Sequence, residues 1–346
     1  MTTLDDYGGW PGVLGTLAAG RDIGPGEARA ALGAILAAEA TDAQVAVFIV
    51  ALRIKDPGVG ELQGLVEAMR DAATPLDIPD GAIDIVGTGG TAGRKTHALN
   101  VSTMACFVAA GAGATVCKHG NVKASSTSGA FDLLDAIGVP IGAAPHEVEQ
   151  TVRSVGLGFA FAKTFHPAMR HVAGVRSQIG IPTVFNLLGP LSHPGRVQRQ
   201  VIGVPEPSLA PTLAAVLQAT GSVRSLVVHG DGRFDEFTTT GPNLVVDLNE
   251  GKVTEYRVLA ADVGLAPATP DELRGGDPVD NARILSGILA GESGPLRDVV
   301  VLNAAAGLVV AGIAEDLAAG VEAAAAAIDD GRAARKFDEV TAASTG

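Results

Sequence analysis

Residues 83–90 read Ile-Asp-Ile-Val-Gly-Thr-Gly-Gly, a short β-branched run that passes directly into glycines. The run predicts a strand, and the glycines predict a loop whose backbone N–H groups are open to phosphate oxygens. No Gly-Lys-Ser/Thr closes the loop, so it is not a Walker A sequence. The dinucleotide fingerprint also fails, because the spacing differs and no acidic residue follows about 20 positions on. Taken alone, the glycines fit a tight turn equally well.

The segments that follow predict strand–helix–strand order. A helix is expected over 102–111 and a second strand over 115–117, which leads into Lys-His-Gly-Asn at 118–121. Both polar loops would then lie at the carboxyl ends of neighbouring parallel strands, where open α/β sheets bind ligands.

Farther along the chain, 226–229 predicts another strand that ends in glycines. Strands near Phe237, Val245 and Tyr256 would extend the sheet in antiparallel fashion, because turn signals separate them. Alanine-rich helices are expected over 299–310 and 314–327, where residue types suited to catalysis are lacking. These helices are interpreted as packing elements.

The N-terminal region differs in kind from the rest. Apolar residues recur at helical spacing from Trp10 to about Ala73, with glycine and proline between the helices. The sequence therefore predicts a small N-terminal helical domain over 1–73, joined by part of 168–190. A larger α/β domain with a central, mostly parallel sheet is expected over 80–346.

Composition narrows the possible ligands. The 346 residues carry a net charge of −13, which argues against a generic binder of nucleic acid or anionic membranes. Between Arg94 and Arg199, however, ten Lys or Arg residues stand against four Asp or Glu, and six of the seven histidines fall there. A locally cationic region in an acidic protein indicates a small anionic ligand.

The two cysteines, Cys106 and Cys117, stand among small apolar residues and are interpreted as buried thiols. No secretory signal pattern and no apolar run of about 18 residues is present. We therefore expect a cytoplasmic protein with no membrane partner.

Polar residues behind the glycine loop suggest a diphosphate site. Asn-Val-Ser-Thr at 100–103 supplies an amide and two hydroxyls at a helix start, although a plain N-cap explains them too. Lys118 adds a mobile cation at a strand end, and Ser125, Ser126 and Ser128 add hydroxyls that ordinary loop polarity would also explain.

Asp235 and Glu236 are adjacent carboxylates that follow a predicted strand. Mg²⁺ prefers a few carboxylates together with water and phosphate oxygens, so this pair is a candidate metal site. Alternation along a strand would point the two side chains to opposite faces, so the site requires a turn or ligation through water. A solvated acidic pair is the alternative.

His166 and Arg176 are expected on one helix, about 80° apart around its axis, so both can face one cleft. The Arg176 guanidinium has the fork geometry that grips a carboxylate. A surface arginine and a helix-capping histidine are the alternatives.

Six motifs in order resemble the anthranilate phosphoribosyltransferase family over nearly the whole chain. They are Gly-Thr-Gly-Gly at 87–90, Asn-Val-Ser-Thr at 100–103, Lys-His-Gly-Asn at 118–121, His-Pro-Ala-Met at 166–169, Phe-Asn-Leu-Leu-Gly-Pro-Leu at 185–191 and Asp-Glu at 235–236. The resemblance implies the fold of the nucleoside phosphorylase/phosphoribosyltransferase class III type and a homodimer. It also implies Mg²⁺-dependent transfer of the phosphoribosyl group from phosphoribosyl diphosphate to anthranilate, in tryptophan biosynthesis.

The resemblance also implies the site residues. Lys118, Arg176 and His119 would be catalytic, and Ser102, Asp235 and Glu236 would hold the metal. The substrates would contact Gly87, Thr88, Gly89, Gly90, Thr91, Thr96, Asn100, Val101, Ser102, Thr103, Lys118, Asn121, Ser125, Ser126, Ala130, His166, Arg176 and Pro190.

Several positions depart from the family pattern around the donor. Thr91 replaces an acidic residue, the stretch up to residue 99 is longer and carries Arg94 and Lys95, Val122 replaces an arginine, and Ala130 replaces a serine. Three alternatives therefore stay open: a related transferase with another aromatic or heterocyclic acceptor, a nucleoside phosphorylase of the same fold group, and a ligand-binding homologue without catalysis.

Overall fold

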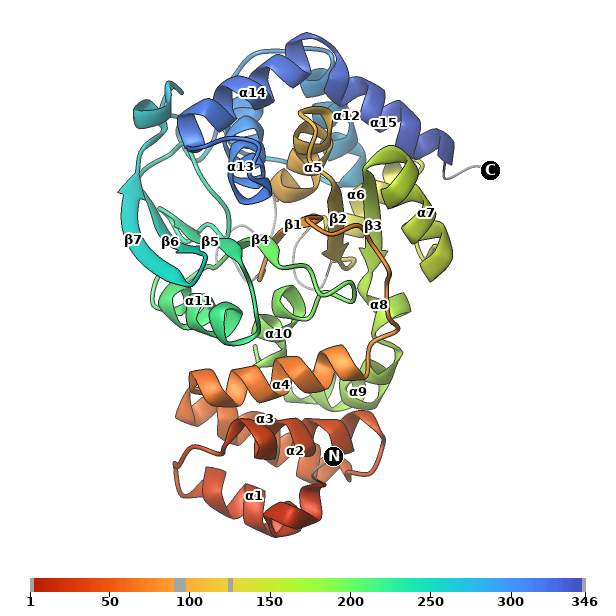
Figure 1. Ribbon diagram of the computed structural model, residues 1–346, viewed down its shortest axis with the longest axis vertical. Coiled ribbons are helices and arrows are strands. Elements are labelled where there is room, and N and C mark those ends of the chain that lie inside the picture. The colour runs from red at the N-terminus through yellow and green to blue at the C-terminus, as the bar shows by residue number, and fades with distance from the viewer. Residues whose placement is uncertain (1–2, 90–97, 124–126, 344–346) are drawn as a thin grey trace.

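A seven-stranded sheet forms the centre of the computed structural model, which describes residues 3–89, 98–123 and 127–343 (Figure 1). The strand order is β3-β2-β1-β4-β5-β6-β7. The first five strands are parallel, and β6 and β7 add an antiparallel edge. The strands are β1 (Ile83–Gly87), β2 (Val116–Gly120), β3 (Leu157–Phe161), β4 (Arg199–Gly203), β5 (Arg224–Gly230), β6 (Asn243–Asn249) and β7 (Lys252–Val258).

The order of the strands creates a switch point between β1 and β4. The chain runs from β1 outward through β2 to β3, then returns to place β4 on the other side of β1. The connections on either side of this pair therefore lead away in opposite directions, and open α/β sheets bind ligands at such a switch point, outside the carboxyl ends of the strands. The glycine loop directly follows β1 at this switch point.

Helices cover both faces of the sheet (Figure 1). On one face α5 and α13 pack against β1, and the apolar cluster there includes Ile83 and Ile85. On the other face α11 packs against β5 and β6. The helices of the larger layer are α5 (Val101–Gly111), α6 (Ala130–Ala136), α7 (Pro145–Val155), α11 (Leu209–Ala219), α12 (Pro278–Leu289), α13 (Pro295–Ala311), α14 (Leu317–Asp329) and α15 (Arg332–Ala343), with the 3₁₀ turn η3 (Ala260–Val263).

The N-terminal helices form a separate layer at the lower end of Figure 1. Their packing is local, since α2 lies against α4 and α1 against α3. Thr41 begins α3 as an N-cap that accepts from the Gln44 N–H, and Pro25 begins α2, where a missing N–H costs nothing. The elements are η1 (Leu4–Tyr7), α1 (Gly9–Ala18), α2 (Pro25–Leu36), α3 (Asp42–Lys55) and α4 (Val59–Asp71).

A middle segment joins the two layers. α9 (Arg170–Ile179) packs against α2 and α3, while α10 (Phe185–Leu191) packs against α4 and β2. One apolar cluster runs from the N-terminal helices through α10 to the sheet. The predicted fold class, a small helical unit beside a larger α/β unit with a mostly parallel sheet, is confirmed.

Several local predictions were wrong. Phe237 lies outside the strands, in the bend before β6. The helix expected from His166 to about Gly180 is found from Pro167 to Ile179, as the 3₁₀ turn η2 (Pro167–Met169) followed directly by α9, but His166 lies outside it with a non-helical backbone (φ −121°, ψ 60°). The preceding helix α8 (Ala162–Phe165) ends before His166, because Pro167 cannot continue it. The angle calculated for His166 and Arg176 on one helix therefore does not apply. β2 continues through Lys118 and His119, which were expected in a loop.

Cys106 and Cys117 are free and buried, as predicted. Across the described ranges, we find no helix with both the length and the apolar character needed to cross a membrane.

The contact between α2 and α4 depends on Gly64. A Cβ at this position would overlap the Pro25 carbonyl oxygen and lie 3.0 Å from the Arg29 nitrogen. We expect Gly64→Ala to lower the free energy of unfolding by about 1–3 kcal/mol, since two backbones must separate. Gly33→Ala in α2 is the matched control, because its Cβ meets no atom within 4 Å. It should raise stability by roughly 0.5–1 kcal/mol in urea unfolding, and equal losses for both variants would contradict the packing argument.

Candidate active site

Two glycines at the ends of neighbouring strands allow another segment to approach the switch point. Gly87 of β1 and Gly203 of β4 are paired in register. A Cβ on either residue would overlap Asp235, which comes from the segment after β5. The Gly89 N–H donates to Asp235 Oδ2 at 2.7 Å, and the Thr88 N–H donates to the Gly203 carbonyl at 2.9 Å. The glycine loop and the acidic pair therefore lie side by side.

Asp235 and Glu236 lie in a bend that leaves the end of β5. Gly230 and Phe234 exchange backbone hydrogen bonds of 3.0 and 3.1 Å, which turns the chain back across the sheet. Because neither acidic residue belongs to a strand, alternation does not separate their side chains. The sequence required a turn at this pair, or ligation through water, for both carboxylates to bind one metal, and the chain does bend here.

Asn303 anchors this bend, and sequence reasoning missed it. Its side chain is buried in α13, accepts from the Phe237 N–H at 3.1 Å and donates to the Phe237 carbonyl at 2.9 Å. Both backbone groups of the residue next to Glu236 are thereby satisfied. A buried asparagine in an alanine-rich helix was the available signal, since a buried amide requires partners.

Lys118 is fixed and buried, and the expectation of a mobile cation at a strand end was wrong. Its side chain is 1% exposed. Its Nζ donates to the Ile85 carbonyl at 2.6 Å and to Ser102 Oγ at 3.2 Å. The charge thus lies between β1, β2 and the start of α5.

Asn100 precedes α5 without capping it through its side chain, so the plain N-cap interpretation is wrong. Its Oδ1 accepts from Ser128 Oγ at 2.7 Å and from Asn281 Nδ2 at 2.8 Å. The network fixes the segment before α5 against α12 and the loop that ends at Ser128. Asn281 was not identified from the sequence. Val101 and Thr103, which follow Asn100 in the chain, are buried.

Three histidines lie close together. The ring centroids of His119 and His166 are 5.1 Å apart, and those of His119 and His193 are 5.7 Å apart. His193 was not identified from the sequence, because it stands in no recognised motif.

Two further residues expected to contact the acceptor lie on other elements. Arg176 of α9 lies over the ring of Phe185, 5.2 Å from its centroid, and Phe185 begins the helix that contains Pro190. Asn121 is exposed, and its Oδ1 accepts from the Val122 N–H at 2.8 Å.

Burial keeps the three histidines neutral. It lowers the pKa of His119 well below its ordinary value, that of His166 to about 4 and that of His193 to about 3. A hydrogen bond with the backbone of Gly189 opposes the shift for His119, and one with Ser192 opposes it for His166. The Nε2 atoms of His119 and His166 are buried and have no hydrogen-bond partner within the described ranges. Polar atoms are thus available to a bound group.

Several predicted positions lie outside the described residues: Gly90, Thr91, Arg94, Lys95, Thr96, Ser125 and Ser126. Ala130 begins α6 and lies close to β2, since a Cβ on Gly120 would meet it at 3.2 Å. The structure brings the glycine loop to the acidic pair, Lys118 to Ser102, and His119 to His166.

The oxygen donors here suit Mg²⁺. Asp235, Glu236 and Ser102 offer carboxylate and hydroxyl oxygens, and the two glycines leave room for the bend that carries the carboxylates. The part of the chain that the structure describes contains no cluster of three His, Cys, Asp or Glu side chains arranged around a metal. Carboxylate and hydroxyl oxygens are ligands that Mg²⁺ takes together with water and phosphate oxygens, so these residue types fit that ion.

Two family models identify the chain as a glycosyl transferase. The model of the glycosyl transferase family helical bundle domain matches residues 11–73, and that of the family's a/b domain matches 80–334. Anthranilate phosphoribosyltransferase of Methylobacterium radiotolerans is 47% identical over 92% of both chains. That of Chloroflexus aggregans is 45% identical over 96% of this chain and 98% of the relative.

Solved structures of the same enzyme resemble the chain over nearly its whole length. Anthranilate phosphoribosyltransferase from Thermus thermophilus is similar with a TM-score of 0.91 at 39% identity, covering 96% of this chain and 99% of that one. The Saccharomyces cerevisiae enzyme in complex with PRPP and Mg has a TM-score of 0.86 at 27% identity, covering 99% and 98%. The chain belongs to the anthranilate phosphoribosyltransferase family.

Gly203→Ala should displace the acidic pair, because the new Cβ would overlap the Asp235 carbonyl oxygen. We expect binding of phosphoribosyl diphosphate in the presence of Mg²⁺ to weaken by at least roughly tenfold, measured by titration calorimetry, because one lost charged contact is worth about this much. Gly15→Ala in α1 is the control, since nothing lies within 4 Å of its Cβ. Unchanged affinity in Gly203→Ala would show that the position of the pair is unimportant for binding.

The neutral His193 makes stability depend on pH. Its folded pKa of about 3 lies below the unfolded value of about 6.5, so the unfolded chain takes up the proton first as pH falls. The stabilisation is complete above about pH 6.5 and is lost toward about pH 3. We expect His193→Asn to reduce the loss of unfolding free energy between about pH 7 and 5 by about 2 kcal/mol in urea titrations. The exposed His146→Asn is the control, and an unaltered pH slope in His193→Asn would contradict the assignment.

Proposed function

We propose that the chain transfers the 5-phosphoribosyl group of phosphoribosyl diphosphate to the amine of anthranilate and releases diphosphate, a step of tryptophan biosynthesis. One observation carries the proposal: the Gly87 loop and Asp235 meet at the switch point of the sheet, in a member of this family. A strand-end glycine loop beside a carboxylate pair suits a diphosphate and its Mg²⁺.

On the donor side, we assign the diphosphate to the backbone of residues 87–91, to Thr96, to the segment 100–103 and to Ser125 and Ser126. Ser102, Asp235 and Glu236 would hold Mg²⁺, which supplies positive charge against the diphosphate when bound. Lys118 donates to Ser102 Oγ at 3.2 Å, so its buried positive charge lies next to one of the proposed metal ligands. Fixed charges of this kind stabilise a departing anion without reorganisation.

On the acceptor side, we assign the aromatic acid to Gly87, Asn121, His166, Pro190 and Arg176. The Arg176 guanidinium is held over the Phe185 ring, and burial lowers its pKa, so a carboxylate partner would offset the cost of its burial. Its role is to orient anthranilate so that the amine faces the anomeric carbon.

The neutral histidines suit this chemistry. The amine of anthranilate is already unprotonated at physiological pH, so positioning matters more than a strong base. His119 and His166 carry depressed pKa values and buried Nε2 atoms, which can bind the acceptor as neutral groups. Uncharged rings also avoid repelling the positive charge that develops on the ribosyl ring.

We further propose a homodimer in a reducing compartment such as the cytoplasm. The resemblance implies the dimer, and the two free cysteines are compatible with reducing conditions. Light scattering of the purified chain tests the dimer, with a monomer at micromolar concentration as the contrary result.

The activity is tested with purified protein, Mg²⁺, phosphoribosyl diphosphate and anthranilate, by loss of anthranilate fluorescence and release of diphosphate. Both signals should appear together. Diphosphate release with another aromatic acceptor, but none with anthranilate, would indicate the related transferase. Consumption of a nucleoside with phosphate would indicate a phosphorylase. No binding of phosphoribosyl diphosphate in calorimetry would exclude both transferases.

Substitutions at the two charged positions should separate the substrates. We expect Arg176→Met to raise the KM for anthranilate about 10- to 100-fold, because a hydrogen bond to a charged group contributes about 1.5–3 kcal/mol. Lys118→Met, which keeps the volume of the buried stem, should act mainly on phosphoribosyl diphosphate. Arg170→Ala, at the exposed start of α9, is the control for Arg176. Equal changes in both KM values in either variant would contradict the assignment of Arg176 to anthranilate and of Lys118 to phosphoribosyl diphosphate.

A further inference from the structure

The C-terminal end of α10 is held by side chains from other elements. α10 has Pro190 inside it and is only seven residues long, so its last carbonyls have no partner within the helix. The buried Gln200 of β4 donates from Nε2 to the Pro190 carbonyl at 2.9 Å. Arg70 of α4 donates from Nε to the Leu191 carbonyl at 3.1 Å. Two adjacent carbonyls are thus bound by different units, one by the sheet and one by the N-terminal helices.

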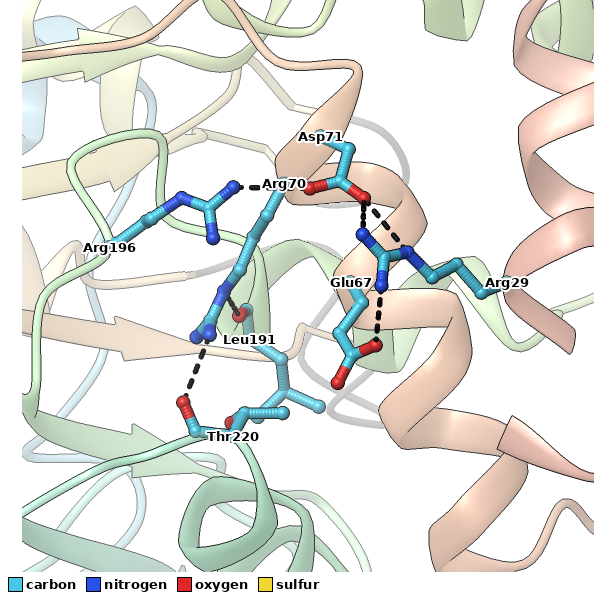
Figure 2. Close-up of polar contacts among 7 residues, drawn as sticks. All are labelled: Arg29, Glu67, Arg70, Asp71, Leu191, Arg196 and Thr220. Carbon is cyan, nitrogen blue, oxygen red and sulfur yellow. Dashed lines mark hydrogen bonds and ion pairs between the residues drawn. The ribbon is translucent and has the colours of Figure 1, made fainter. Parts of the chain in front are cut away.

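Arg70 binds two helix ends at once, as Figure 2 shows. Besides Leu191 of α10, its Nη1 donates at 3.3 Å to the carbonyl of Thr220, the C-cap of α11. Burial lowers its pKa to about 10, so removing this charge from water carries a cost. The negative ends of two helices offset that cost. The planar guanidinium, with its several donors, can serve both carbonyls together.

Gln200 is fixed at its other side by the strand that carries the glycine loop. It pairs in register with Asp84 of β1, so the backbone ladder between the two strands fixes its position. Asp84 Oδ1 accepts in turn from the His119 N–H at 3.2 Å. Gln200, which holds the Pro190 carbonyl, thus belongs to the strand beside Asp84, and Asp84 in turn holds the backbone of His119, a residue of the proposed acceptor site.

A second contact between the same units does not involve α10. Arg196 donates to Asp71 Oδ1 at 3.2 Å, and Arg29 of α2 pairs with Asp71 and Glu67 of α4, within the N-terminal helices (Figure 2). These side chains are more exposed, at 59% for Arg196 and 42% for Arg29. Exposed ion pairs contribute little, so Arg196 joins the two units without fixing the Pro190 backbone.

We propose that Arg70 and Gln200 are positioning residues for the acceptor: they hold the carbonyls of Leu191 and Pro190, and thereby set the place of the Pro190 ring. Arg70 also makes that place depend on the docking of the N-terminal helices against the sheet. The inference rests on the proposed function, because it requires Pro190 to contact the acceptor. Neither residue needs to touch a substrate.

The test compares steady-state kinetics and binding for Arg70→Met, Arg70→Lys, Gln200→Met and Arg196→Ala. In Arg70→Met and Gln200→Met, the KM for anthranilate should rise about tenfold, the loss expected for one hydrogen bond of this kind. The KM for phosphoribosyl diphosphate should stay within about twofold. Arg70→Lys keeps the charge and one donor group, so it should recover part of the affinity for anthranilate. Arg196→Ala should leave both KM values within about twofold.

Three results would overturn the proposal: equal rises in both KM values, a lowered melting temperature with unchanged kinetics, or an Arg196→Ala effect as large as that of Arg70→Met. If Arg70→Met does not fold, Arg70→Lys decides, because a wild-type KM for anthranilate in that variant would exclude a role for the two-carbonyl contact. Turnover by the unaltered enzyme is measured first. Its absence with anthranilate would reject the proposed function, whereas normal turnover with unaffected variants would reject only this inference.

Discussion

The structure depends on one steric constraint, the absence of side chains at Gly87 and Gly203. These glycines end β1 and β4 in register, and the segment that carries Asp235 lies against both of them. With a Cβ at either position, the bend after β5 would have to move away from the switch point of the sheet. The glycine loop would then lose its contact with the carboxylate. Asn303 reinforces the arrangement by binding the backbone just beyond Glu236.

A second constraint is the burial of polar side chains around the proposed acceptor site. His119, His166 and His193 are buried and neutral, and their neighbours Asp84 and Lys118 are fully covered too. Such groups are stable inside a protein only when the fold supplies partners, and the backbone supplies most of them here. The Ile85 carbonyl binds Lys118, and the Cys117 carbonyl binds His193 at 2.9 Å. The site is thus built from strand and helix ends rather than from ion pairs.

Sequence reasoning succeeded where the pattern was local. The N-terminal helices follow the 3.6-residue periodicity, and β1 and β5 are β-branched runs that end in glycine, so each could be predicted from its own residues. Sequence reasoning failed where contacts between residues far apart in the chain determine the local structure. The polar Lys118 and His119 looked like loop residues, yet β2 continues through them because Asp84 and the Ile85 carbonyl provide partners across the sheet. Phe237 resembled a strand residue, but Asn303 holds its backbone in the bend.

By itself, the sequence determined the fold class, the order of the motifs and the residue types needed to bind a diphosphate, a divalent cation and an aromatic acid. These properties depend on composition, periodicity and the chemistry of single side chains. Only the tertiary structure decided which residues meet: Asp235 with the glycine loop, His193 with His119, and Arg70 with the end of α10. Such contacts join residues that are far apart in the chain. Strand order and helix packing determine them, and no local sequence pattern contains that information.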